Sequence, residues 1–113
     1  MKYLFFLYIF LASNFFSIAQ TATAPNNGDG SSGEPYQIAS LENLYWIASN
    51  TAVWDDNAYF IQTADIDASE TSTWFSNGAG GYFGWYPIGS DSTGKTKFNG
   101  YYDGNNFTIS NLY

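Results

Sequence analysis

The 113-residue sequence contains no cysteine, no histidine and no arginine. Without cysteine, the chain can form neither a disulfide framework nor the lipid-modified cysteine of a lipoprotein. Ten acidic residues outnumber three lysines, and the formal net charge at pH 7 is −7. Because nucleic acids and anionic membranes are themselves negatively charged, we expect neither of them as a binding partner.

The beginning of the chain indicates export. A single cation, Lys2, precedes an apolar stretch over residues 3–12, and residues 17–19 (Ser-Ile-Ala) fit a small-x-small cleavage site. A membrane anchor is the alternative, but a membrane-spanning helix needs about 20 apolar residues, and polar residues interrupt this stretch sooner. We therefore predict a signal peptide over residues 1–19, no membrane span after cleavage, and a secreted or cell-surface location. The remaining 94 residues suffice for one small domain.

Residues 20–34 have the composition of a linker. Thr, Ala, Asn, Gly and Ser surround a single proline, and such a segment cannot bury a core. A calcium-binding loop over residues 27–33 is the alternative, but an EF-hand loop needs spaced oxygen ligands, a closing Glu and a following helix. We predict a flexible linker over residues 20–34 and a folded part over residues 35–113.

One helix is predicted near the start of the folded part. Ser40 is a suitable N-cap, and Glu42 lies in the first turn, where the helix dipole favours negative charge. The segment that follows carries an apolar stripe at helical spacing, which ends near residues 49–50 and consists of Leu41, Leu44, Tyr45 and Ala48. Docking of this stripe on a partner is possible, but a helix beside strands usually covers its own core. We therefore expect a lid.

The segment over residues 59–67 is rich in aromatic and β-branched residues and is predicted to form a strand. Tyr59 and Ile61 share one parity, whereas Ile66 has the other. We predict that a bend or bulge near residues 63–64 brings all three side chains inward.

The last sixteen residues have the pattern of strand, turn and strand. The turn over residues 103–106 is built from Asp, Gly and Asn, which tolerate positive φ. On either side of the turn, apolar residues alternate: first Phe98, Gly100 and Tyr102, and then Phe107 and Ile109. The β content therefore rises towards the C-terminus.

Four segments together carry a resemblance to a known family. They are residues 34–38 (Glu-Pro-Tyr-Gln-Ile) with Leu41 and Leu44 after them, residues 64–67 (Ala-Asp-Ile-Asp), residues 84–89 (Gly-Trp-Tyr-Pro-Ile-Gly) and the block over residues 98–112. This pattern resembles the N-terminal part of bacterial surface proteins with GLUG-type repeats. That family includes adhesin-like proteins and the non-catalytic region of some immunoglobulin-cleaving peptidases.

The resemblance implies a mostly β fold, in which an N-terminal capping helix covers the first rungs of a right-handed parallel β-helix. The Gly-Leu-hydrophobic-Gly motif that names the family would follow Leu112 and Tyr113, where this sequence ends. Several repeats are normally needed for a stable solenoid. We therefore expect this chain to be a fragment of a longer protein.

Catalysis without histidine or cysteine would have to rest on carboxylates. Asp65 and Asp67 are the nearest pair, and strand alternation places both of them opposite Ile66. Together with Glu70 they could hold a calcium ion, although a solvated strand end is the plainer interpretation. A lyase also needs a basic residue for the developing anion, and few are present. We expect no enzyme and no cofactor, with calcium as the one possible ligand.

An aromatic cluster surrounds the glycine-rich loop over residues 77–81. Trp74, Tyr82, Trp85 and Tyr86 are the residues most suited to stack on sugar rings, with Phe75 and Phe83 beside them. The alternative is that these rings pack beneath the loop, and it is favoured because the family pattern treats residues 84–89 as framework.

These observations predict a secreted or cell-surface, non-enzymatic segment with a structural or adhesive role. Its partner would be a host or cell-surface protein or a glycan. Two alternatives stay open: a carbohydrate-binding surface over residues 74–86, and the non-catalytic stalk of a surface peptidase whose zinc domain would lie downstream.

Overall fold

The computed structural model describes residues 20–55, 57–89 and 97–113, so the predicted signal peptide lies outside the described residues. The chain forms short strands and short helices. In order they are β1 (Tyr36–Ile38), α1 (Leu41–Ser49), α2 (Ala52–Asp55), β2 (Tyr59–Gln62), β3 (Ile66–Asp67), the 3-10 helix η1 (Ser69–Thr73), β4 (Tyr101–Asp103) and β5 (Ile109–Ser110).

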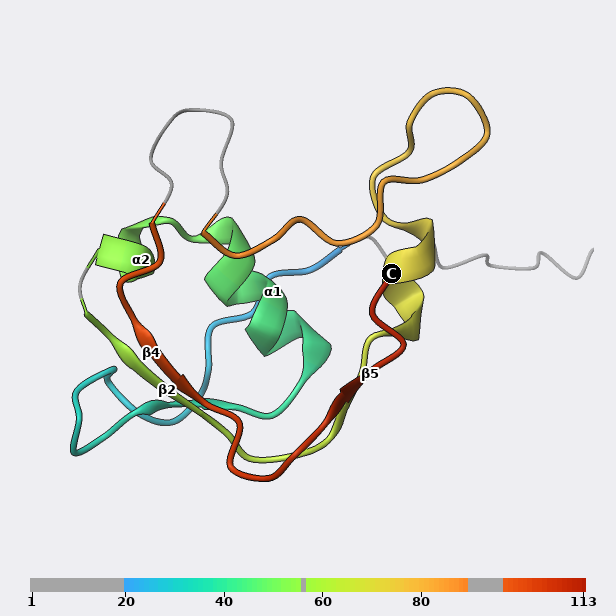
Figure 1. Cartoon of the computed structure of the whole chain (residues 1–113). Coiled ribbons are helices and arrows are strands. Elements are labelled where there is room, and N and C mark those ends of the chain that lie inside the picture. The colour runs from blue at the N-terminus through green and yellow to red at the C-terminus, as the bar shows by residue number, and fades with distance from the viewer. Residues whose placement is uncertain (1–19, 56, 90–96) are drawn as a thin grey trace, which may run out of the picture.

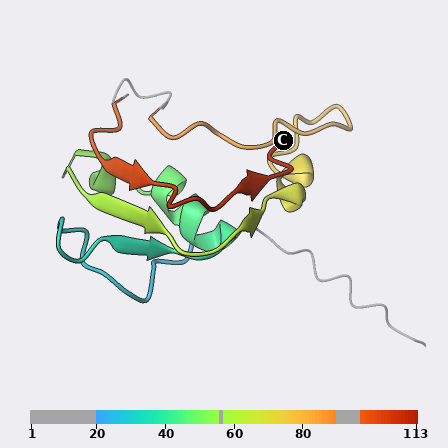
Figure 2. The ribbon, with the colours of Figure 1, turned by 60° about the horizontal axis from the view of Figure 1, so that its bottom comes forward.

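The strands form two small sheets in which every pair is parallel. One sheet has the order β1-β2-β4, with Tyr59 opposite Tyr101, and the other pairs β3 with β5, with Ile66 opposite Ile109. Figure 2 shows the three strands of the larger sheet side by side. A short corner over residues 63–65 joins β2 to β3, and a corner over residues 104–108 joins β4 to β5. The later strand–corner–strand unit therefore lies along the earlier one.

The prediction of a right-handed parallel β-helix is wrong. The described residues form two small sheets with strands of two to four residues, and they do not form a closed solenoid. The connections explain this difference. Between β1 and β2 the chain forms two helices, and the turn that begins with β1 contributes no strand to the smaller sheet. Among the described residues, the pair of strands β2 and β3 is repeated once, as β4 and β5, and this does not make a solenoid.

Helix α1 lies inside the curve formed by the two sheets and covers their inner face (Figure 1). The predicted cap is confirmed, because the Ser40 hydroxyl accepts a hydrogen bond from the Asn43 N–H at 3.2 Å. The buried face of α1 consists of Leu41, Leu44 and Ile47. These side chains share the core with Ile38, Val53, Trp54, Ala58, Phe60, Ile66, Ala68 and Trp74. The helix is the lid that the sequence predicts.

The bend between β2 and β3 is confirmed, and Ile66 is buried as predicted, but the prediction that Tyr59 and Ile61 face inward is wrong. Phe60 and Gln62 are each 1% exposed, whereas Tyr59 and Ile61 are half-buried on the outer face. Ile66 shares the parity of Phe60 and Gln62, so even-numbered residues face the core both before and after the bend. The sequence pattern alone does not predict the burial of Gln62.

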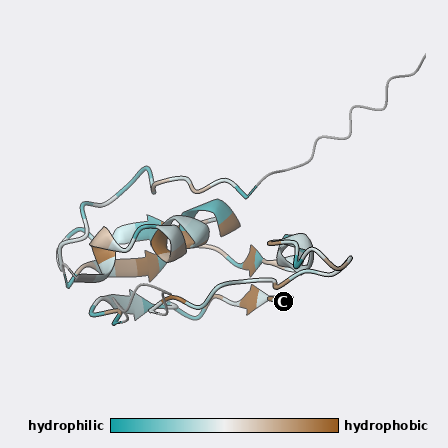
Figure 3. Cartoon of the chain, turned by 90° about the horizontal axis from the view of Figure 1, so that it is seen from above, coloured by the Kyte–Doolittle hydropathy of each residue, from teal (hydrophilic) through white to brown (hydrophobic). Residues whose placement is uncertain are grey.

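The segment predicted as a linker runs against the folded body. The Thr23 N–H donates to the Glu42 carbonyl at 3.1 Å, and the Gln37 N–H of β1 donates to the Asn27 carbonyl at 3.0 Å. The Tyr59 N–H donates to the Gly30 carbonyl at 2.8 Å. Residues 27–30 therefore cover the outer edge of β1. At the opposite side of the molecule, the strand layer that ends at the C-terminus forms an outer face (Figure 3).

Candidate functional site

The aromatic residues predicted to bind sugars divide into a packed pair and an exposed pair. Trp74 is only 4% exposed, and its ring stacks on that of Trp85 with centroids 5.8 Å apart at 27°. Tyr45 of α1 meets Trp74 edge to face at 4.9 Å. Trp74 and Trp85 thus fasten the segment after η1 to the helix.

Tyr82 and Tyr86 remain accessible on the loop, with exposed fractions of 46% and 52%. Tyr86 contacts Phe75 at a centroid distance of 4.5 Å, and the described ring contacts do not join it to Trp74 or Trp85. The structure therefore does not bring the four predicted residues onto one flat face. Any sugar platform here would consist of the exposed tyrosines and their neighbour Phe83.

The acidic residues considered as calcium ligands act as hydrogen-bond acceptors between the two strand–corner–strand units. Asp65 Oδ1 accepts from both the backbone N–H and the hydroxyl of Thr108, at 2.9 and 3.2 Å. Asp67 Oδ1 accepts from the Ser69 N–H at 3.0 Å and from the Asn111 side-chain amide at 3.2 Å. Both carboxylates thus help to fix one unit against the other.

The hydrogen bonds to Asp67 also affect its titration. The backbone N–H of Ser69, and next the Asn111 amide, stabilise the ionised form and lower the pKa of this carboxyl below its ordinary value. Glu70 lies exposed in η1. Among residues 20–55, 57–89 and 97–113, no three acidic, histidine or cysteine side chains form a group that could hold a metal ion, so the predicted trio is not assembled.

A buried glutamine links three parts of the chain. Gln62 Nε2 donates to the Ala64 carbonyl at 2.9 Å and to the Thr108 carbonyl at 3.0 Å, and its Oε1 accepts from the Tyr102 hydroxyl at 3.0 Å. Every polar group of the side chain is therefore paired, as a buried amide requires. This network joins β2 to β4 and to the corner before β5.

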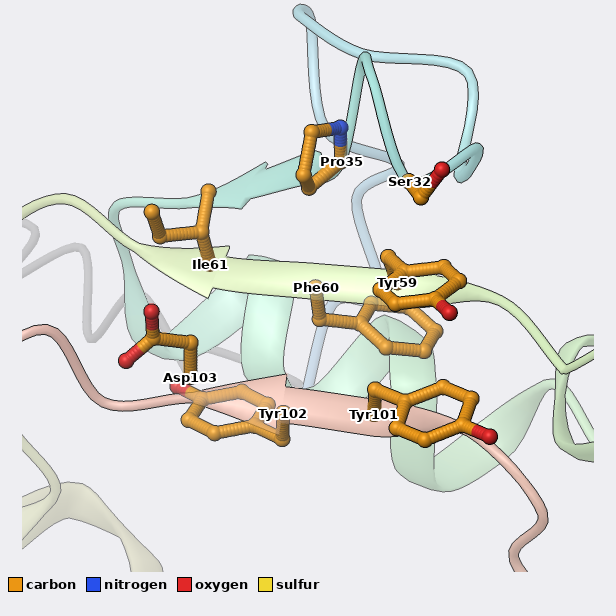
Figure 4. A pocket seen from close by; sticks show the side chains of 8 residues that line it. All are labelled: Ser32, Pro35, Tyr59, Phe60, Ile61, Tyr101, Tyr102 and Asp103. Carbon is orange, nitrogen blue, oxygen red and sulfur yellow. The ribbon is translucent and has the colours of Figure 1, made fainter.

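The outer face of the larger sheet carries a groove of about 400 Å³ (Figure 4). Tyr59 and Tyr101 lie opposite each other in register, and their rings stack at 4.5 Å with an angle of 13° between planes. Ile61 and Asp103 form the next row of the same face. The rest of the lining consists of Ser32, Pro35, Phe60 and Tyr102. The sequence shows both strands, but it does not show that Tyr59 pairs with Tyr101 and Ile61 with Asp103. That register joins segments about forty residues apart.

The edge strand β4 is paired with β2 along one side, and its other side has no strand partner among the residues that the structure describes. The Tyr101 N–H donates to the Ala58 carbonyl at 2.9 Å, and in a parallel ladder alternate residues point their backbone groups to opposite sides. The backbone groups of Tyr102 therefore point away from β2. Below this edge lies an apolar cavity of about 260 Å³, lined by Leu44, Ile88, Phe98, Tyr102 and Ile109.

Comparison with known proteins gives one informative similarity. The chain is 37% identical over 90 residues to halomucin of Haloquadratum walsbyi (strain DSM 16790 / HBSQ001), a match that covers 80% of this chain and 1% of halomucin. No protein-family model matches the chain, and no solved structure matches it. Since halomucin is an archaeal protein, the comparison supports neither the GLUG repeats nor the bacterial source that the sequence resemblance implies.

Proposed function

We propose that the chain is a structural or adhesive segment of a secreted or cell-surface protein. Two findings support the location: the predicted export segment over residues 1–19, and the similarity to halomucin, which is a large archaeal surface protein. In the part of the chain that the structure describes, no helix has the length and apolar character to cross a membrane. The chain matches only 1% of halomucin, so its role is proposed for the segment alone.

The observation that carries the adhesive role is the exposed face along β4, β5 and the last residues. Large apolar and aromatic side chains are accessible there, with exposed fractions of 56% for Tyr101, 39% for Phe107, 50% for Leu112 and 67% for Tyr113. Several large apolar side chains exposed on neighbouring elements favour an interaction site. A non-enzymatic role agrees with the carboxylates of Asp65 and Asp67, which are occupied by structural hydrogen bonds.

Localisation tests this proposal. The full chain with a C-terminal epitope tag should be recovered from the medium or the cell surface, and its N-terminal residue should be Gln20. A matched control that lacks residues 1–19 should stay inside the cell. Recovery of the full chain from the cytosol with Met1 still in place would contradict the proposal.

A carbohydrate-binding loop is a second candidate, because Tyr82 and Tyr86 are accessible and both follow the glycine-rich turn over residues 77–81. Affinity electrophoresis in gels that contain polysaccharides tests it. Retardation that is lost in both Tyr82→Ala and Tyr86→Ala but kept in Tyr113→Ala would support this loop. Equal migration with and without every polysaccharide tested would remove the candidate.

A further inference from the structure

We propose that the free edge of β4 binds an extended, basic segment of another protein, which adds to the larger sheet as a further strand. This inference deepens the proposed adhesive role and rests on it, because it names the chemistry of the partner. Three features of the described residues support it: the backbone of the edge, the cavity beneath it and the charged aromatic groove above it.

The two edges of the larger sheet differ. At β1, the outward N–H of Gln37 is already bonded to the Asn27 carbonyl, so residues 27–30 cover that edge. At β4, Tyr102 points its N–H and carbonyl away from β2, and neither group has a hydrogen-bond partner among the described residues. One residue of an antiparallel incoming strand could therefore exchange both hydrogen bonds with Tyr102. Addition of a strand to such an edge is an established mode of peptide recognition.

The cavity determines which type of inward-facing side chain the partner segment should carry. A residue placed opposite Tyr102 would direct its side chain over the 260 Å³ cavity between Leu44, Phe98 and Ile109. The lining is almost wholly apolar, so an aliphatic or phenyl side chain fits there and a charged one does not. The partner should therefore carry an apolar residue at this position.

The groove determines which outward-facing residues the partner segment should carry. One face of the Tyr101 ring is stacked on Tyr59, and because β4 is the edge strand, the other face is turned to the free side (Figure 4). Asp103 lies on the same face of β4, and its Oδ1 accepts the local hydrogen bond from the Asn105 N–H at 2.8 Å. An arginine beside this pair could stack on Tyr101 and pair with Asp103.

Charge also decides against a second copy of this chain as the occupant. Each copy has a formal net charge of −7. A basic partner has the complementary charge.

Titration with synthetic peptides tests the inference on the purified chain. The probe is the peptide Thr-Thr-Thr-Arg-Ile-Arg-Thr-Thr-Thr, and binding is followed by the NMR shift of the Tyr102 amide. We expect saturable binding that weakens with salt. We also expect weaker binding for two altered probes: one with the central isoleucine N-methylated, and one with the order Ile-Arg-Ile at its centre.

Matched variants separate this site from general charge attraction. Asp103→Asn keeps the acceptor for the Asn105 N–H but removes the charge, and it should weaken binding by about threefold, as expected for an exposed ion pair. Glu70→Gln removes another exposed carboxylate, outside the groove, and should leave binding unchanged.

Three results would overturn the inference: no binding of the probe, equal binding of the N-methylated peptide, or a concentration-dependent dimer of the chain alone that involves β4. None of these results would alter where the chain is localised, so the proposed function is tested separately.

Discussion

The hydrogen-bond network of Gln62 provides the sharpest test of the fold. We predict that Gln62→Leu destabilises the chain although it places an apolar side chain in a site that is only 1% exposed. The substitution removes three hydrogen bonds, to Ala64, Thr108 and Tyr102. At about 0.5–1.5 kcal/mol each, with added cost for the groups left unpaired, the free energy of unfolding should fall by about 2–4 kcal/mol.

Urea unfolding followed by tryptophan fluorescence measures this change. Gln37→Leu is the matched control, because Gln37 lies exposed on the neighbouring strand β1, and its effect should stay within about 0.5 kcal/mol. Tyr102→Phe removes one hydroxyl of the network. The double mutant of Gln62 and Tyr102 should show a coupling of about 1 kcal/mol. A Gln62→Leu variant as stable as the parent would refute this reasoning.

Three further predictions concern pH and a glycine. Burial raises the pKa of Tyr102 to about 12, so the folded state favours the neutral form of its hydroxyl. The difference in the free energy of unfolding between the parent and Tyr102→Phe should be complete below about pH 10 and decrease towards pH 12. A difference that stays constant with pH would contradict this prediction. The Ser69 N–H and the Asn111 amide lower the pKa of Asp67. The contribution of its carboxylate to folding stability should therefore be present above about pH 4 and be lost on further acidification. Asp67→Asn should reduce the fall of the melting temperature with acid. Gly84 has φ of +78°, and a Cβ there would collide with the carbonyl oxygen of Tyr113; Gly84→Ala should therefore cost about 1–3 kcal/mol in urea unfolding, clearly more than Gly78→Ala, which has similar φ but open space.

Local features were predictable from the sequence. The helix from Ser40 to residue 49 depends on a cap and an apolar stripe within one segment. The cap occurs as expected, and of the predicted stripe Leu41 and Leu44 are buried, with Ile47 in place of Tyr45 and Ala48 as the third buried residue. The turn over residues 103–106 depends on residues that tolerate positive φ, and Asn105 and Asn106 adopt φ of 48° and 61°. These elements need no information from distant parts of the chain.

Features that depend on distant partners were not predictable. Gln62 is buried because Thr108 and Tyr102, forty or more residues away, satisfy its amide, whereas alternation alone favours the apolar Ile61 as an inward residue. The expected β-helix was wrong because recognisable strand and turn patterns do not reveal how the connections between them run. The stacking of Tyr59 on Tyr101 likewise depends on the register of parallel strands.

Residue-resolved hydrogen exchange at β4 tests most directly the claim that this chain presents a free edge to a partner. In the protein alone, the Tyr101 amide should be protected, because it donates to Ala58, and the Tyr102 amide should exchange rapidly. Addition of the Arg-Ile-Arg peptide should protect Tyr102. Protection of Tyr102 in the free monomer, or rapid exchange that the peptide leaves unchanged, would contradict the account.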